Sequence, residues 1–129
     1  MKKIALLLVV ASLFIASPVM ANDGNDLLNK CGEVIKLINK EDASSVSFTK
    51  AEHCYGLLIG TVETHELLSK HNNSEKFFCL SSGVTNNQAI MVIVKYLKEH
   101  PEILHRSAST LILLALQKNF PCPEPQPSK

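Results

Sequence analysis

Residues 85–101 read TNNQAIMVIVKYLKEHP, and this stretch decides the fold class. It opens with Thr85 and Gln88 at the spacing of a capping box, in which two side chains each accept a backbone N–H at the start of a helix. The apolar residues that follow recur at helical steps: Ile90, Val94 and Leu97. The pattern ends at His100, because Pro101 disfavours helical geometry in the residue before it. The stretch therefore predicts a helix with a defined start and a defined end.

Three further segments of the chain have the same periodicity: residues 25–38, 49–67 and 101–119. Asn25 or Asp26 is a suitable cap for the first of them, and Thr49 and Glu52 form another capping box in the second. Pro101 suits the first turn of the last segment, because a proline there loses no helical hydrogen bond. No segment alternates in the manner of a strand. We therefore expect an all-α fold, a small bundle of about four main helices in two antiparallel hairpins.

The first 21 residues have the composition of a secretory signal peptide. Lys2 and Lys3 form a positive start, residues 4–16 are apolar apart from Ser12, and Ala21 ends a stretch that a signal peptidase reads. This apolar run of 13 residues is shorter than the ~20 that a membrane-spanning helix needs. We expect residues 1–21 to be cleaved off as a signal peptide, so that the mature chain is exported without a membrane anchor.

The mature chain, residues 22–129, has the length of a single helical domain with a proline-rich tail from about residue 121. Loss of Lys2 and Lys3 changes its formal charge from +1 to −1. A nearly neutral chain has no basic stripe for nucleic acid and no polybasic patch for anionic lipid. The chain also has no Trp, so a stacking surface for sugars or single-stranded nucleic acid is not expected.

Four cysteines lie in the mature chain: Cys31, Cys54, Cys79 and Cys122. An even number of cysteines in a small exported domain indicates a disulfide framework. A zinc site is disfavoured because close ligand pairs are missing, and we expect no metal and no cofactor. The helical hairpins bring Cys31 near Cys54 and bring Cys79 near Cys122. These pairings are therefore favoured, while the other two connectivities remain open.

No combination of residues indicates an enzyme. The pair His65-Glu66 begins like a zinc-protease helix, but the second histidine ligand is missing. His53 precedes Cys54, yet a surface histidine beside a disulfide cysteine explains that pair better than a nucleophile does. Gly56 and Gly60 are spaced for close helix packing. We expect them to let a neighbouring helix approach within the core, with a dimer face as the alternative.

The mature chain resembles the Rap/Tai family of immunity proteins against type VI secretion amidase effectors. The motifs that carry the resemblance agree in order and spacing over about 70 residues: Cys54-Tyr55-Gly56, Gly60, Phe78-Cys79, Gly83-Val84-Thr85, Gln88, Tyr96-Leu97, His100-Pro101-Glu102, Ala115-Leu116 and Phe120-Pro121-Cys122-Pro123. One position departs from the family pattern, because Ser81 stands where a proline is common. The resemblance implies a periplasmic helical protein, often a homodimer, that binds and blocks a Cys–His peptidoglycan amidase and thereby protects the producing cell.

Two surfaces are candidates for binding the effector. One is the polar loop that leads into Cys79, and its candidate residues are His71, Asn72, Asn73 and Glu75. The other is the hairpin tip at Pro101, and its candidate residues are Glu99, His100 and Glu102. An ordinary solvated linker explains the loop equally well. Two other classes of protein remain open, a periplasmic chaperone that binds unfolded clients and a carrier with a pocket between the hairpins.

Overall fold

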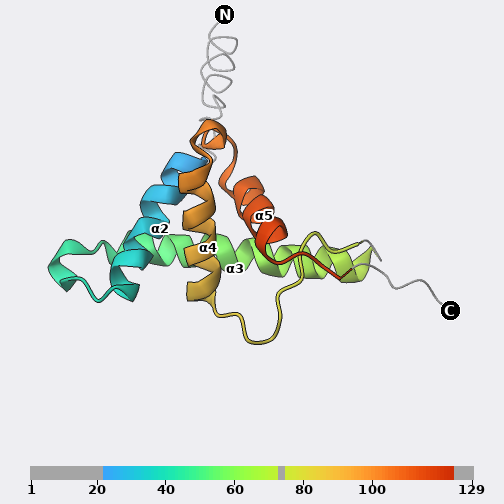
Figure 1. Cartoon of the computed structure of the whole chain (residues 1–129). Coiled ribbons are helices and arrows are strands. Elements are labelled where there is room, and N and C mark those ends of the chain that lie inside the picture. Colours follow the sequence, from blue (N-terminus) through green and yellow to red (C-terminus); the bar gives the residue numbers. More distant parts are fainter. Residues whose placement is uncertain (1–21, 73–74, 124–129) are drawn as a thin grey trace, which may run out of the picture.

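The computed structural model describes residues 22–72 and 75–123 (Figure 1). The expected signal peptide, Asn73 and most of the proline-rich tail lie outside these residues. The described residues form four α-helices and two 3₁₀ helices: α2 (Gly24–Ile38), η2 (Ala43–Ser45), α3 (Phe48–His71), α4 (Asn86–Glu99), η3 (Pro101–Ile103) and α5 (Ala108–Asn119). About 71% of the described residues are helical, which confirms the all-α fold class.

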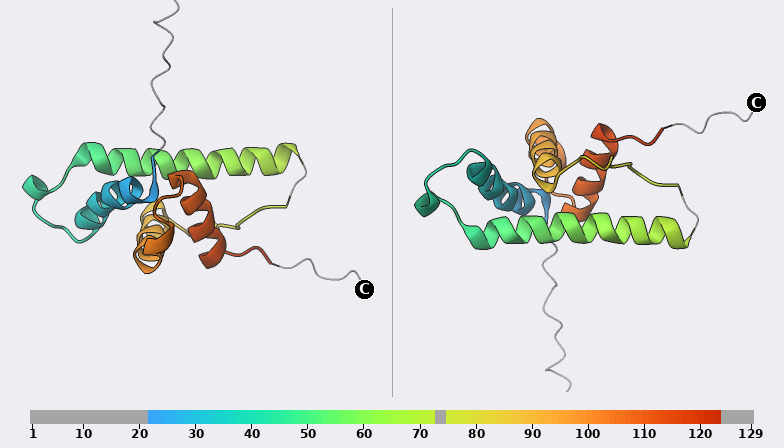
Figure 2. Two further views of the ribbon diagram at one scale, coloured as in Figure 1. Left: turned by 90° about the horizontal axis from the view of Figure 1, so that it is seen from above. Right: turned by 90° about the horizontal axis from the view of Figure 1, so that it is seen from below.

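The other helices lie together on one side of α3 (Figure 2). Helix α3 has 24 residues and is therefore about 36 Å long at ~1.5 Å per residue. Helices α2 and α5 pack directly on it, and α4 packs on α2 and α5 at a greater distance from α3. The C-terminal part of α3 extends past α5, and from there the chain returns towards α4.

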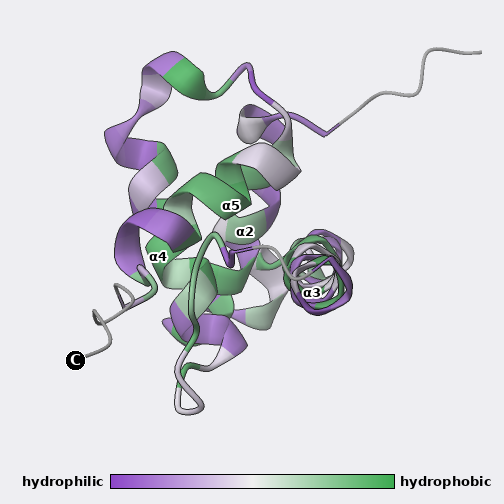
Figure 3. Cartoon of the chain, turned by 90° about the vertical axis from the view of Figure 1, so that its right-hand side faces the viewer, coloured by the Kyte–Doolittle hydropathy of each residue, from purple (hydrophilic) through white to green (hydrophobic). Residues whose placement is uncertain are grey.

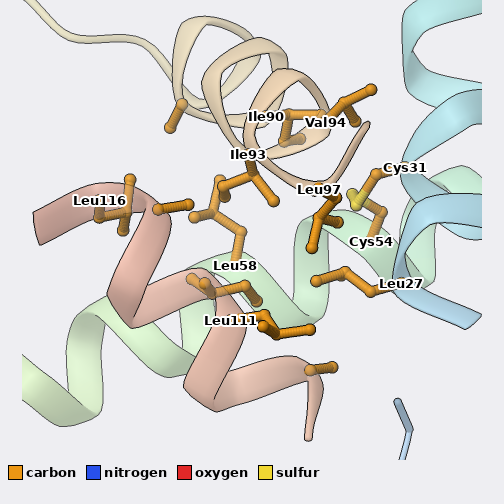
Figure 4. Packing of buried hydrophobic residues seen from close by; sticks show 14 of the residues in the cluster. Leu27, Cys31, Cys54, Leu58, Ile90, Ile93, Val94, Leu97, Leu111 and Leu116 are labelled. Carbon is orange, nitrogen blue, oxygen red and sulfur yellow. A yellow bond between two sulfur atoms is a disulfide. The ribbon is translucent and has the colours of Figure 1, made fainter. Parts of the chain in front are cut away.

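The core lies where these four helices meet (Figure 4). Its largest member is Phe78, and the next largest are fully buried leucine and isoleucine side chains: Leu27, Leu58, Ile90, Ile93, Leu97, Leu111, Ile112 and Leu116. Burying one such side chain contributes roughly 1.5–3 kcal/mol relative to leaving it in water. Because α4 supplies Ile90, Ile93 and Leu97 to this core, the apolar pattern of residues 85–101 is the buried face of a helix, as predicted.

Both favoured disulfides are present. Cys31 and Cys54 join α2 to α3 with an S–S distance of 2.06 Å, and both residues are buried in the core. Cys79 and Cys122 are joined at 2.03 Å and are half-buried. Beside this second bond the Cys79 N–H donates to the carbonyl oxygen of Phe120 at 2.9 Å. The segment that follows α3 is thus fastened to the end of α5.

The capping box of α4 is confirmed, whereas the other predicted caps are wrong. Gln88 N–H donates to Thr85 Oγ1 at 3.2 Å, and Thr85 N–H donates to Gln88 Oε1 at 2.8 Å. The cap of α2 is Asp23, which accepts the Asp26 N–H at 2.9 Å, so neither Asn25 nor Asp26 has that role. The cap lies two or three residues earlier than expected, at the point where the N–H of Gly24 contacts the α4–α5 connection.

Helix α3 begins before the capping box that was expected at Thr49. Its N-cap is Ser47, whose side chain makes no capping hydrogen bond, and Thr49 lies inside the first turn. The Ser47 N–H instead donates to Glu33 Oε2 on α2, at 2.8 Å. A carboxylate from another helix therefore accepts a backbone N–H at the start of α3, and it replaces the local capping box.

The predicted helix at 101–119 is divided into η3 and α5. Between them the backbone pairs with the residues before α2, because Gly24 N–H donates to the carbonyl oxygens of Leu104 at 2.8 Å and Arg106 at 3.0 Å. Ala108 N–H donates to the carbonyl oxygen of Asn22 at 2.7 Å. These carbonyl and N–H groups are satisfied by a distant segment, so the helix restarts at Ala108 with Ser107 as its cap.

Candidate functional site

The structure keeps the two predicted surfaces apart (Figure 1). His71, Asn72 and Glu75 are exposed at the C-terminal end of α3, and Asn73 lies outside the described residues. The hairpin-tip residues Glu99, His100 and Glu102 lie between α4 and α5, at a different end of the molecule. The two sets therefore cannot form one compact site within a single chain.

The hairpin tip has its own internal contacts. His100 Nδ1 lies 3.2 Å from Glu102 Oε1, and the His100 ring packs on Tyr96 with ring centroids 4.5 Å apart. The pKa of Glu102 is lowered mainly by a hydrogen bond from its own backbone N–H; burial opposes this effect, and the contact with His100 lowers the pKa further. The tip is thus an ordered surface that carries a negative charge at neutral pH.

The segment after the predicted loop is held against α3 by three consecutive residues. Lys76 Nζ contacts both carboxylate oxygens of Glu66, at 2.8 and 3.1 Å, and this hydrogen bond lowers the pKa of Glu66. Phe77 N–H donates to His65 Nε2 at 2.9 Å. The ring of Phe78 stacks on His65 with centroids 4.3 Å apart. The three residues directly before Cys79 therefore anchor the segment on α3, in addition to the disulfide.

The two adjacent phenylalanines have opposite environments. Phe78 is fully buried, whereas Phe77 is 58% exposed. Leu68, one turn beyond His65 on α3, is 52% exposed. Neighbouring exposed apolar side chains that form a patch often mark an interaction surface, whereas a single exposed apolar side chain does not. Phe77 and Leu68 line the same groove, which makes this side of α3 the principal candidate site.

A groove of about 730 Å³ runs between α3, α5 and the anchored segment. Most of the side chains that line it are apolar or small. Among the described residues, Glu75 is the one acidic residue in the lining. The residues that line it are Gly56, Leu57, Gly60, Thr61, Thr64, His65, Leu68, Ser69, Asn72, Glu75, Phe77, Ser109 and Leu113. Two residues of the predicted loop, Asn72 and Glu75, thus lie on the edge of this groove.

The expectation that Gly56 and Gly60 pack inside the core is wrong. Both glycines are exposed, and a Cβ atom added at either position meets nothing within 4 Å. They line the groove on α3, opposite Ser109 and Leu113 of α5. Hydrophobic and hydrophilic residues both occur around α3 when it is seen end-on (Figure 3). Its backbone is therefore open to close approach from outside the molecule.

Apart from Asn72 and Glu75, the residues that shape the groove were not recognised as site residues from the sequence. The sequence indicated His65 and Glu66 only as a failed zinc-protease motif and Phe78 only as part of the family motif Phe78-Cys79, and it gave no signal at Phe77. One signal was available, since the apolar residues of α3 do not fall on a single stripe: Leu57, Leu58, Leu67 and Leu68 occur in adjacent pairs. When a helix has two apolar faces and one of them packs in the core, the other remains exposed.

The described residues contain no group of three metal-ligating side chains positioned to hold a metal ion. All four cysteines are paired in disulfides. No helix in the described part of the chain is long and apolar enough to cross a membrane. The arrangement is thus one of exposed apolar side chains, open helical backbone and a polar rim, which is suited to binding another molecule.

The chain was compared with protein families, curated proteins and solved structures. The model of a family described as Rap1a immunity proteins matches residues 23–122. No curated protein and no solved structure matches the chain. The family match includes all four helices, both disulfides and the whole described part of the groove. The chain therefore belongs to the Rap1a immunity protein family.

Proposed function

We propose that this protein is a periplasmic immunity protein that binds the peptidoglycan amidase effector of a type VI secretion system and blocks its active site. The observation that carries the proposal is the match to the Rap1a immunity family over residues 23–122. An immunity protein acts by binding its effector, so it needs a complementary surface and no catalytic machinery of its own. The amidase is the target class that the family resemblance implies.

The geometry of the groove supports this proposal. The segment that contains Glu75, Lys76 and Phe77 is held by α3 and by the Cys79–Cys122 disulfide before any partner arrives. Binding then costs less conformational entropy, because the segment is already ordered. Phe77 and Leu68 provide exposed apolar area, and the polar groups of His71, Asn72 and Glu75 lie nearby at the end of α3.

Inhibition of the amidase tests the proposal directly. The mature chain is mixed with the type VI amidase of the same cell, and the release of peptides from purified peptidoglycan is measured. We expect release to stop near one equivalent of the immunity protein and calorimetry to give a single tight binding event. Undiminished release at excess immunity protein, with no heat of binding, would falsify the amidase target. The immunity protein alone should release no peptide.

The compartment and the oligomeric state belong to the same proposal. The family match begins at residue 23, one residue after the expected start of the mature chain at Asn22. Two disulfides suit the oxidising periplasm. The open face of α3 at Gly56 and Gly60 is available to a second copy, so we propose a homodimer. Mass spectrometry of the periplasmic fraction should find a chain that begins at Asn22, and light scattering should give twice its mass.

A chaperone is the second candidate function, because large apolar side chains are exposed along one helix: Leu67 and Leu68 of α3, with Phe77 beside them. A chaperone would suppress the aggregation of several unrelated unfolded proteins, whereas an immunity protein should suppress none. Light scattering of reduced insulin and of heated citrate synthase, with and without the protein, separates the two functions. Suppression of both substrates at equimolar protein favours the chaperone.

A further inference from the structure

His65 makes contacts with the segment that returns from the end of α3. It lies on α3, and its Nε2 atom is 2.9 Å from the backbone nitrogen of Phe77. Its ring stacks on Phe78 at a centroid distance of 4.3 Å and an interplanar angle of 20°. Its Nδ1 atom is buried and has no hydrogen-bond partner among the described residues. His65 is therefore the point at which α3 holds the returning chain.

The direction of the hydrogen bond determines which form of the ring can make it. A backbone N–H only donates, so Nε2 of His65 must accept and must carry no hydrogen. The single ring hydrogen of the neutral imidazole is then on the buried Nδ1. A protonated imidazole carries hydrogens on both nitrogens and accepts at neither. The contact with Phe77 is thus available to the neutral ring alone.

We propose that His65 is a positioning residue whose neutral imidazole latches the backbone of Phe77 onto α3, and that protonation of the ring releases this contact. Glu75 and Phe77 line the groove, so the latch sets the position of one of its edges. Histidine is the side chain whose charge changes most readily near neutral pH. The groove therefore has its described shape while His65 is neutral, and that edge loses its hydrogen bond when the ring is protonated.

The charged groups near His65 come from α3 and from the returning segment. On α3 the nearest charges are Glu66 and Lys70, and both oxygens of Glu66 are bound by Lys76 from the returning segment. Glu75 is the remaining charged residue of that segment at the groove, and α5 contributes the uncharged Ser109 and Leu113. The Cys79–Cys122 pair does not titrate because it is a disulfide. When Nε2 is protonated, the Phe77 N–H is left without its partner.

Hydrogen exchange of the Phe77 amide, measured by NMR on the full mature chain, tests the latch without any substitution. The observed rate is divided by the intrinsic rate at each pH, because exchange itself depends on pH. Between about pH 8 and pH 5 we expect the protection of Phe77 to fall by about tenfold or more, while the buried amide of Leu97 keeps its protection. Equal protection of Phe77 at both pH values overturns the proposal.

Two variants of His65 separate the acceptor from the stacking. His65→Gln supplies a side-chain oxygen that does not titrate in this range, so Phe77 should stay protected at both pH values. His65→Phe keeps the stack on Phe78 but removes the acceptor, so protection should be low at both. His53→Gln is the control, because His53 is exposed and faces Lys30 at 3.3 Å, and it should keep the wild-type profile. Wild-type pH dependence in His65→Gln overturns the latch.

The consequence for partner binding rests on the proposed function, whereas the latch does not. All of these exchange measurements use the isolated chain, so they remain decisive if the amidase proves not to be the partner. If the amidase is the partner, its affinity for the wild-type chain should fall in acid more steeply than its affinity for His65→Gln. Equal pH dependence in the two chains would remove the groove edge from the interface and leave the exchange result intact.

Discussion

At Gly24 one missing methyl group lets two distant parts of the chain meet. Its N–H donates to two carbonyl oxygens of the α4–α5 connection, and an added Cβ atom would lie 2.8 Å from Leu104 O and 2.9 Å from Leu104 Cα. It would also press on the side chain of Leu111 in the core. The close approach is to backbone atoms, which cannot rotate away.

We therefore expect Gly24→Ala to destabilise the fold by about 1–3 kcal/mol, the usual cost of overpacking. Gly32 provides a matched control on the same helix, because a Cβ atom there meets nothing within 4 Å. Gly32→Ala should stabilise the fold by about 0.5–1 kcal/mol, since an interior glycine weakens a helix. Urea unfolding measures both, and a shift of the same sign in the two variants contradicts this account of Gly24.

Glu33 connects α2 to the start of α3 through an ionised carboxylate. It accepts the Ser47 N–H at 2.8 Å and Lys36 Nζ at 3.0 Å. These hydrogen bonds, led by that from Ser47, hold the pKa of Glu33 below the ordinary glutamate value of about 4.3. A lowered folded-state pKa means that the stabilisation is present above the ordinary value and is lost as pH falls through the lowered one.

Glu33→Gln should therefore lower the melting temperature at pH 7, where the wild-type carboxylate is ionised in both states. The difference between the two proteins should shrink as the pH falls below about 4, because the wild-type side chain then becomes neutral as well. Calorimetry from pH 7 to about pH 3 measures the difference. Asp26→Asn, which changes another carboxylate on the same helix, is the control for general charge effects. A constant difference across this range contradicts the assignment.

At the scale of elements, α3 combines a buried face with an open one. Gly56 and Gly60 weaken the helix but meet no neighbour, so alanine at either position should stabilise the free protein by about 0.5–1 kcal/mol. If the effector or a second copy packs on this face, the same methyl groups should weaken that contact. Unfolding and binding measurements on Gly56→Ala, with Gly32→Ala as control, should give opposite signs for stability and affinity. Unchanged affinity places the interface elsewhere.

The two predicted surfaces can be separated because they lie at different ends of the molecule. Replacing His71, Asn72, Asn73 and Glu75 together by alanine should weaken amidase binding by several kcal/mol, because truncation leaves buried partner groups unsatisfied. Thermal stability should hardly change, since the described members are exposed. Replacing Glu99, His100 and Glu102 is the matched experiment at the tip. Full protection of cells by the loop variant, together with loss of protection by the tip variant, assigns the interface to the tip.

Local patterns predicted the helices better than they predicted the helix ends. The capping box of α4 was correct because Thr85 and Gln88 satisfy each other within one turn. The start of α3 was missed because its backbone partner is Glu33, 14 residues earlier. The division of the last helix was missed for the same reason on a longer scale, since the backbone at Gly24 pairs with Leu104. Patterns within one segment contain no information on such partners.

At the scale of the whole molecule, both disulfide pairs followed from the helical hairpins, but the groove did not. The groove needs α3 to extend past α5 and needs residues 76–78 to return onto α3. Neither the length of that overhang nor the contact between Phe77 and His65 has a local signature. The candidate loop therefore lies near the end of α3 that carries the groove, while most of the residues that line the groove were not identified.

The two disulfides stabilise the fold in different ways. Cys31 and Cys54 are 23 residues apart in the sequence and Cys79 and Cys122 are 43 apart, so chain entropy alone assigns ~3.5 and ~4 kcal/mol to them and ranks the second higher. Burial ranks them in the opposite order, because Cys31 and Cys54 are 1% and 0% exposed within the core. Replacing both of these by alanine also removes core contacts and leaves a cavity.

We expect packing to outweigh the small entropic difference of about 0.5 kcal/mol, so that Cys31→Ala with Cys54→Ala destabilises the fold more than Cys79→Ala with Cys122→Ala. Urea unfolding of the two double variants measures the order. The second variant should keep the protected core amides of α4 while residues 76–80 lose protection, because its bond fastens the edge of the groove. The reverse order of stability would show that loop closure dominates. Amidase affinity lost only in the second variant would place the groove edge, and not the core, in the interface.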